Sequence, residues 1–170
     1  MTRTTNKLLP RLSLFDRLLQ GDSLETDRNA DRAWRELRES VRRDLEILFT
    51  TRPRYLSIAP KLEEVRSSIL TFGMQDIQTQ QLATTSQLEQ FRFMLESLIR
   101  KFEPRFRDVS IELLTTTDTL DRTLRFRIHA ILQTNASSEP VTYDTAVEPV
   151  SGRLMLVADS SWARPKSGRQ

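Results

Sequence analysis

The 170-residue chain contains no cysteine, one histidine and four glycines. The lack of cysteine excludes disulfides and thiolate metal sites, and it fits a reducing compartment, so a cytoplasmic location is expected. The few glycines leave little room for a phosphate-binding loop, and neither G-x-x-x-x-G-K-[ST] nor G-x-G-x-x-G occurs. The single histidine, His129, has no second histidine or cysteine to share a metal with. We therefore expect neither a cofactor nor a metal.

Long apolar runs are also absent, since none approaches the roughly 20 residues that span a bilayer. The N-terminal residues carry no apolar region of the kind found in secretory signals, so no membrane insertion is expected. The net charge is only +3, with 23 acidic residues interspersed among 26 basic ones, so nucleic-acid binding is not expected either. Arginine supplies most of the positive charge and suits bidentate contacts at protein interfaces.

Helical patterns dominate the first hundred residues. A short apolar stripe follows Pro10, and polar residues 22–30 form a linker after it. Longer helices are predicted over 31–49, from Pro60 to about residue 73, and over 86–103, where Ser86 and Glu89 match a capping box. The charged face of the 31–49 helix carries Arg42 and Arg43, and it suits solvent and a protein interface about equally.

The period then changes to the alternation of β-strands, over 109–113, 124–132, 141–147 and 153–159. Helices followed by consecutive strands predict an α+β fold, with N-terminal helices packed on one face of a C-terminal antiparallel (mixed) sheet. Glu112 is expected opposite Arg125, with Asp118 near the centre of the turn between the first two strands. The predicted layout is a docking segment at 1–22, one α+β domain at 31–159 and a disordered tail at 160–170.

The predicted core joins the helical stripes to one face of the sheet. Its helical members are Trp34, Leu37, Val41, Leu88, Leu95 and Leu98, and its strand members are Val109, Ile111, Phe126 and Ile128.

Glu103 stands at the C-terminal end of a predicted helix, where the helix dipole disfavours a carboxylate. It precedes Pro104, and Lys101 and Arg105 flank it. A catalytic acid needs a raised pKa, whereas neighbouring cations would lower it, so an enzyme is disfavoured. An ionic latch remains, formed either inside the domain or with another subunit.

Four phrases carry a resemblance to a known family. They are SLFDRLL (13–19), ESVRRDLEILFTTRP (39–53), SILTFGMQDI (68–77) and LIRKFEPRF (98–106), and alternating strands follow them. In this order the chain resembles TssE, the type VI secretion baseplate subunit, which is similar to a wedge protein of contractile phage tails once labelled lysozyme-like. The most specific piece is Glu103-Pro104-Arg105, and the phrase at 71–77 departs from the usual family pattern.

The resemblance implies a non-enzymatic subunit of a baseplate wedge with TssF, TssG and TssK. It also implies a template on which TssB and TssC begin the sheath by strand pairing. The alternative that the old label suggests is a peptidoglycan hydrolase of the same apparatus.

Two further regions are predicted to meet protein partners. Leu14, Phe15 and Leu18 are expected to form a docking stripe for the wedge subunits. An open sheet edge is expected in the C-terminal strands, either at 140–147 with Tyr143 or at 153–159 with Leu156.

Overall fold

The computed structural model describes the parts of the chain that hold its helices and strands. These are residues 10, 13–20, 30–54, 58–59, 61–75, 84–114, 123–134, 137–148 and 154–158. The predicted turn at Asp118, the helix start at Pro60 and the tail from 160 lie outside the described residues.

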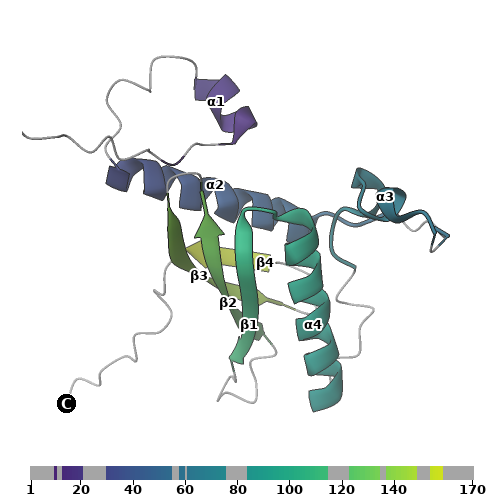
Figure 1. Ribbon diagram of the computed structural model, residues 1–170. Coiled ribbons are helices and arrows are strands. Elements are labelled where there is room, and N and C mark those ends of the chain that lie inside the picture. The colour runs from purple at the N-terminus through teal and green to yellow at the C-terminus, as the bar shows by residue number, and fades with distance from the viewer. Residues whose placement is uncertain are drawn as a thin grey trace, which may run out of the picture.

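The architecture is the predicted α+β arrangement, with helices first and a sheet second (Figure 1). The helical elements are α1 (Leu14–Gln20), α2 (Ala30–Thr50), α3 (Glu63–Arg66), the 3₁₀ turn η2 (Ile69–Thr71) and α4 (Thr85–Phe102). The strands are β1 (Phe106–Leu114), β2 (Leu124–Gln133), β3 (Ser138–Val147) and β4 (Leu154–Ala158). They pair in the order β1-β2-β3-β4, and every pairing is antiparallel rather than mixed.

The two long helices pack on one face of this sheet, with α4 beside β1 and α2 reaching β4 (Figure 1). Phe126 of β2 joins both helices to the sheet, because Phe49 of α2 and Phe91 of α4 each meet its ring edge-on at 6.4 Å. Edge-to-face contacts of this kind add to the burial of apolar area. The core therefore forms between the helices and the inner face of the sheet.

Most of the predicted core residues are buried as expected. Leu37, Val41, Leu95, Val109, Ile111, Phe126 and Ile128 are buried, whereas Trp34, Leu88 and Leu98 are half-buried. Of the half-buried residues, Trp34 and Leu98 still pack against the core cluster.

Two local predictions were wrong. The capping box of α4 is formed by Thr84 and Gln87, which exchange hydrogen bonds of 3.3 and 3.0 Å, and not by Ser86 and Glu89. Both pairs match the same sequence pattern, so the pattern alone left the helix start uncertain by two residues. The helix predicted around Val65 is also shorter than expected, since α3 spans four residues before η2 replaces it.

The predicted cross-strand pair of Glu112 with Arg125 was wrong, because the observed register of β1 on β2 differs by two residues. Glu112 lies opposite Arg127, not Arg125, and its carboxylate is 3.3 Å from His129 Nε2. Arg127 instead donates to Asp144 of β3, with Nε 2.6 Å from Oδ1. The register depends on the length of the turn, which the position of Asp118 did not define.

Leu95→Ala is expected to lower the free energy of unfolding by about 2–5 kcal/mol, because it leaves a cavity between α4 and the sheet. Leu95 is fully buried in the core. Urea denaturation measures the loss, and Phe93→Ala on the exposed side of α4 is the matched control, expected within about 0.5 kcal/mol of the parent. Equal losses for the two variants would contradict the packing described above.

Candidate functional site

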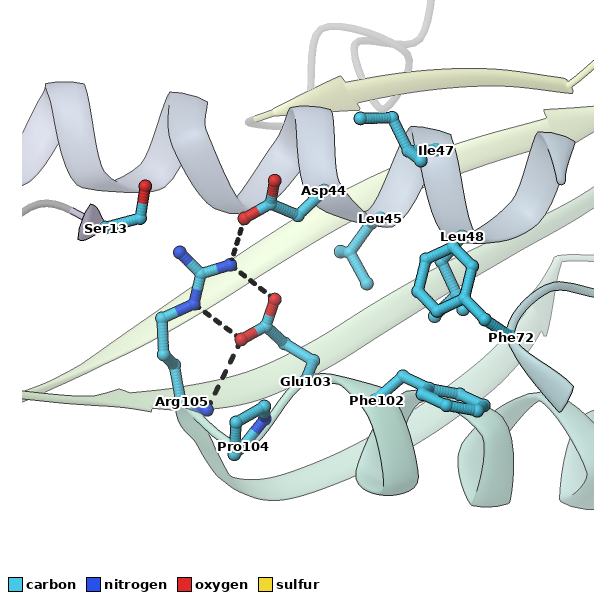
Figure 2. A pocket seen from close by; sticks show the side chains of 10 residues that line it. All are labelled: Ser13, Asp44, Leu45, Ile47, Leu48, Phe72, Phe102, Glu103, Pro104 and Arg105. Carbon is cyan, nitrogen blue, oxygen red and sulfur yellow. Dashed lines mark hydrogen bonds and ion pairs between the residues drawn. The ribbon is translucent and has the colours of Figure 1, made fainter. Parts of the chain in front are cut away.

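The chain leaves α4 through an ionic latch, which we define as Glu103, Arg105 and Asp44 (Figure 2). Glu103 caps the helix, and its backbone N–H donates to the Ile99 carbonyl at 2.8 Å. Its buried carboxylate accepts hydrogen bonds from Arg105 Nε and Nη2, both at 2.5 Å. Arg105 Nη2 also donates to the carboxylate of Asp44 on α2. The latch therefore ties the end of α4 to the middle of α2.

Pro104 makes this geometry possible, because it cannot continue the helix and so turns the chain at once. Arg105 then lies two residues after Glu103 and folds back over its carboxylate (Figure 2). Burial would lower the pKa of Arg105, but the ion pairs with Glu103 and Asp44 outweigh it and raise that pKa. The guanidinium thus stays charged and offsets the unfavourable place of Glu103 at the helix end.

The internal latch is the first of the two arrangements that the sequence left open. A general acid must be able to give its proton to a substrate, whereas the Glu103 carboxylate is enclosed and bonded to a cation. The geometry suits a structural latch. Arg105 Nη1 is buried without a hydrogen-bond partner in the described part of the chain.

A cavity of about 330 Å³ opens beside the latch. Figure 2 shows Leu45 and Leu48 of α2 on one side, with Phe72 and Phe102 beyond Glu103. The two phenyl rings meet edge-on at 5.2 Å. The cavity is therefore apolar on one side and ionic on the other, and its rim carries the exposed Pro104.

α1 lies on α2 through its polar side rather than its apolar side. Asp16 is buried and accepts hydrogen bonds from Ser40 Oγ at 2.5 Å and Arg43 Nη2 at 2.8 Å, both on α2. Ser13 Oγ donates to the same carboxylate at 2.8 Å. Burial raises the pKa of Asp16, but these donors together lower it below its usual range. The anchor therefore stays charged at neutral pH and weakens only as acid protonates it.

This anchor leaves the predicted docking stripe facing outwards. Leu14 and Phe15 are each 68% exposed, and Leu18 is 73% exposed. Asp16 and Ser40 were not among the predicted site residues, although an aspartate inside an apolar stripe is a signal of a polar anchor. That the stripe meets a protein partner stays a prediction.

The edge of the sheet at β1 is closed by side chains of α4. Glu96 accepts a hydrogen bond from the Ile111 N–H at 3.0 Å, and Arg100 Nη2 donates to the Val109 carbonyl at 2.6 Å. These backbone groups point away from β2, where another strand would otherwise pair. A buried glutamate four residues before an arginine thus occupies this edge.

The opposite edge, at β4, pairs with no further strand among the described residues, and α2 lies beside it. Arg42 is the side chain that reaches it in the described part of the chain, with Nη1 3.4 Å from the Leu156 carbonyl. Arg42 is itself held by Glu39 and Glu46 at 2.8 and 2.9 Å. Of the two segments predicted as an open edge, 140–147 is not an edge, because β3 lies between β2 and β4. The other segment, at 153–159, contains β4, which is an edge strand.

Tyr143 and Leu156 both place their side chains in the core. Tyr143 is buried, and its hydroxyl donates to the Arg38 carbonyl at 3.2 Å. Burial raises the pKa of that hydroxyl. Leu156 lies opposite Thr145 with its side chain buried. Only the backbone of Leu156 therefore faces the edge, and its carbonyl accepts the hydrogen bond from Arg42.

Residues 35–137 match the family model described as baseplate wedge protein gp25. The chain belongs to the gp25 family of baseplate wedge proteins. No curated protein matches it. The family confirms the resemblance drawn from the sequence and gives the chain a structural role in a baseplate.

The residues that match the gp25 family model include the latch but not all of the candidate interaction surfaces. Glu103, Pro104, Arg105 and the closed edge at β1 fall inside the matched residues, whereas α1 and β4 lie outside them. No described helix is long and apolar enough to cross a membrane. Among the described residues there is also no cluster of three or more metal-ligating side chains.

Proposed function

We propose that this gp25-family chain is a non-enzymatic wedge subunit of a type VI secretion baseplate, equivalent to TssE, and that it starts the sheath. In this proposal the first TssB and TssC subunits add a strand to the edge of β4. The family membership supports the baseplate role. The edges of the sheet support the choice of β4, since two side chains bond backbone groups of β1 at 3.0 and 2.6 Å, whereas Arg42 alone bonds β4 in the described part of the chain, at 3.4 Å.

The register supports the same edge in atomic terms. Antiparallel neighbours alternate between residues that face each other and residues that face away. Ile111 faces away from β2, and it shares a row across the sheet with Ile128, Tyr143 and Ala158. The N–H and C=O groups along this row therefore alternate in direction: those of Ile128 face β3, those of Tyr143 face β2, and those of Ala158 face away from β3. Leu156, two residues before Ala158, faces the same way as Ala158. β4 thus turns backbone groups outwards that an extended segment of a sheath subunit can pair with, and such a segment would replace the 3.4 Å contact of Arg42 with the Leu156 carbonyl.

α1 supplies the second contact of the proposal, with the wedge subunits TssF, TssG and TssK. Its Asp16 anchor fixes the helix on α2, so that four large apolar side chains, Leu14, Phe15, Leu18 and Leu19, face outwards without cost to the core. A rigid apolar helix face fits a groove on another protein better than a loose segment does, because less conformational freedom is lost on binding. The complete baseplate forms in the cytoplasm in this proposal, with no direct insertion into the membrane and no nucleic acid.

Leu14→Ser with Phe15→Ser and Leu18→Ser is expected to abolish copurification of TssF, TssG and TssK with the tagged chain. The three side chains are exposed, so the domain should keep its unfolding midpoint. Deletion of residues 1–20 should abolish copurification in the same way. The matched control is Ile47→Ser, which changes an exposed apolar side chain on α2 instead of α1 and should leave copurification intact. If the triple variant unfolds, or if it copurifies like the parent, the stripe is not a docking surface.

The hydrolase alternative is tested by the turbidity of purified cell walls. The parent chain should leave the turbidity unchanged, because the enclosed Glu103 carboxylate is bonded to Arg105. Clearing of the suspension that depends on Glu103 would reverse the assignment and make the chain an enzyme.

A further inference from the structure

A groove with basic walls lies at the end of α2 that is remote from α1. It has a volume of about 500 Å³ and forms where the residues after α2, the α3–η2 segment and the second half of α4 meet. A second hollow of about 700 Å³ adjoins it and shares Pro53 and Arg54 with it. The two hollows together form a surface apart from the α1 stripe and the β4 edge, and Phe72 is common to the second hollow and the cavity beside the latch.

Three cations line the first hollow without a carboxylate partner in the described part of the chain. They are Arg54, Arg66 and Lys101, which come from three different segments. Burial, and then the charge of Arg66, lowers the pKa of Lys101, so like charges are close together here. Among the described residues, Lys101 Nζ donates to a neutral acceptor, Thr71 Oγ1, at 3.1 Å, and lies 4.8 Å from the centre of the Phe102 ring. An entering carboxylate would relieve this repulsion.

Apolar side chains form the floor and the rim of the same surface. Met94 and Leu98 of α4 lie on the floor. Ile69 on the rim is 85% exposed, and Leu70 beside it is 37% exposed. Methionine adapts its shape readily to a bound aliphatic group. The surface therefore suits a ligand that carries both carboxylates and an aliphatic side chain.

The wall of the groove is held firmly by its backbone. Gly73 has a φ of 114°, and a Cβ there would lie 2.4 Å from the Thr51 carbonyl oxygen. The next residue, Met74, donates its N–H to that same oxygen at 2.9 Å. Glycine is required here for both reasons, and the η2 segment is thereby fixed against the end of α2. A groove that is already formed costs less conformational entropy to fill.

We propose that this groove binds an acidic segment of a partner protein, with an aliphatic residue between its carboxylates. A single nucleic-acid strand fits less well, because it needs aromatic faces on which bases can stack. Phe72, the aromatic residue that lines the second hollow in the described part of the chain, is half-buried and already packed against Phe102. The proposal is independent of the baseplate assignment, since it rests on the charges and shape of this surface alone.

The test is a selection of random short peptides displayed on phage against the full-length purified chain. Enriched peptides should be rich in Asp and Glu with interspersed Leu, Ile or Val. Arg54→Glu with Arg66→Glu should weaken the binding of a synthetic selected peptide by roughly tenfold or more, because it replaces attraction with repulsion. Binding should also fall as salt is raised from about 0.1 to about 1 M, where the Debye length drops to roughly 3 Å.

The matched control is Arg35→Glu, which reverses an exposed charge near the other end of α2 and should leave the affinity unchanged. Circular dichroism checks that all variants fold. The proposal fails if no peptide is enriched, if the enriched peptides are not acidic, or if the double variant binds them as the parent does. It also fails if a single-stranded thymidine oligonucleotide binds more tightly than the peptides and loses binding in the double variant.

Discussion

Arg105→Ala is expected to lower the free energy of unfolding by about 3–5 kcal/mol, because it leaves the buried carboxylate of Glu103 without its cation. The side chain of Glu103 is 5% exposed, so water cannot replace the lost partner. Urea denaturation followed by far-ultraviolet circular dichroism measures the loss. The helix content of the folded variant should stay close to that of the parent, since the latch joins α4 to α2 without forming either helix.

The control for this result is Asp44→Ala, which removes the outer member of the latch. Asp44 is 46% exposed, and an exposed ion pair contributes about 0–1 kcal/mol, so this change should be mild. Glu103→Ala should likewise keep the helices, and it should impair assembly of the baseplate, because the freed Arg105 no longer holds its position. Equal losses for Arg105→Ala and Asp44→Ala would show that the latch does not depend on the buried pair. Normal secretion with Glu103→Ala would remove the role in assembly.

Periodicity predicted the elements of the fold because burial on one side leaves a direct trace in the sequence. The stripe of α2 and the alternation of β2 are both complete enough to fix the element type and its inner face. The same patterns could not fix the register of β1 on β2, since a shift by two residues keeps every side chain on its own face. The pairing of Glu112 was therefore wrong while Ile111 was correctly placed in the core.

The candidate site was predicted only in part, for a different physical reason. Helix-end electrostatics indicated that Glu103 needs a cationic partner, but the sequence left open whether the latch forms inside the domain or with another subunit. Asp44 is 61 residues away from Arg105, and Ser40 is 24 residues away from Asp16. Contacts at such separations depend on how α2 lies over the rest of the chain, which periodicity does not define.

The closed edge at β1 shows the same limit most clearly. Glu96 lies on the buried side of α4, where the apolar pattern gives no reason to expect a carboxylate. Its role becomes visible only when the backbone N–H of Ile111 is known to point at it. The structure thus separates two edges that look equivalent in sequence.

Leu156→Pro is expected to reduce the number of sheaths by roughly tenfold or more, the equivalent of about 1.4 kcal/mol or above in strand pairing. Proline removes the N–H of residue 156 from the outer edge of β4, where a sheath strand would pair. The pairing of β4 with β3 uses the residues that alternate with it, so that ladder should survive. Sheaths are counted in live cells by the fluorescence of labelled TssB, and copurification with TssF shows that the variant still enters the wedge.

The matched control is Leu156→Ala, which loses the same buried side chain but keeps the N–H. Both variants should therefore lose similar stability, and only the proline variant should lose sheaths. Tyr143→Pro cannot serve as a second test, because β3 is an interior strand and Tyr143 is paired with Ile128 on one side and Ala158 on the other. If the folded proline and alanine variants start sheaths equally often, the backbone of β4 is not the template, and the sheath begins elsewhere on the wedge.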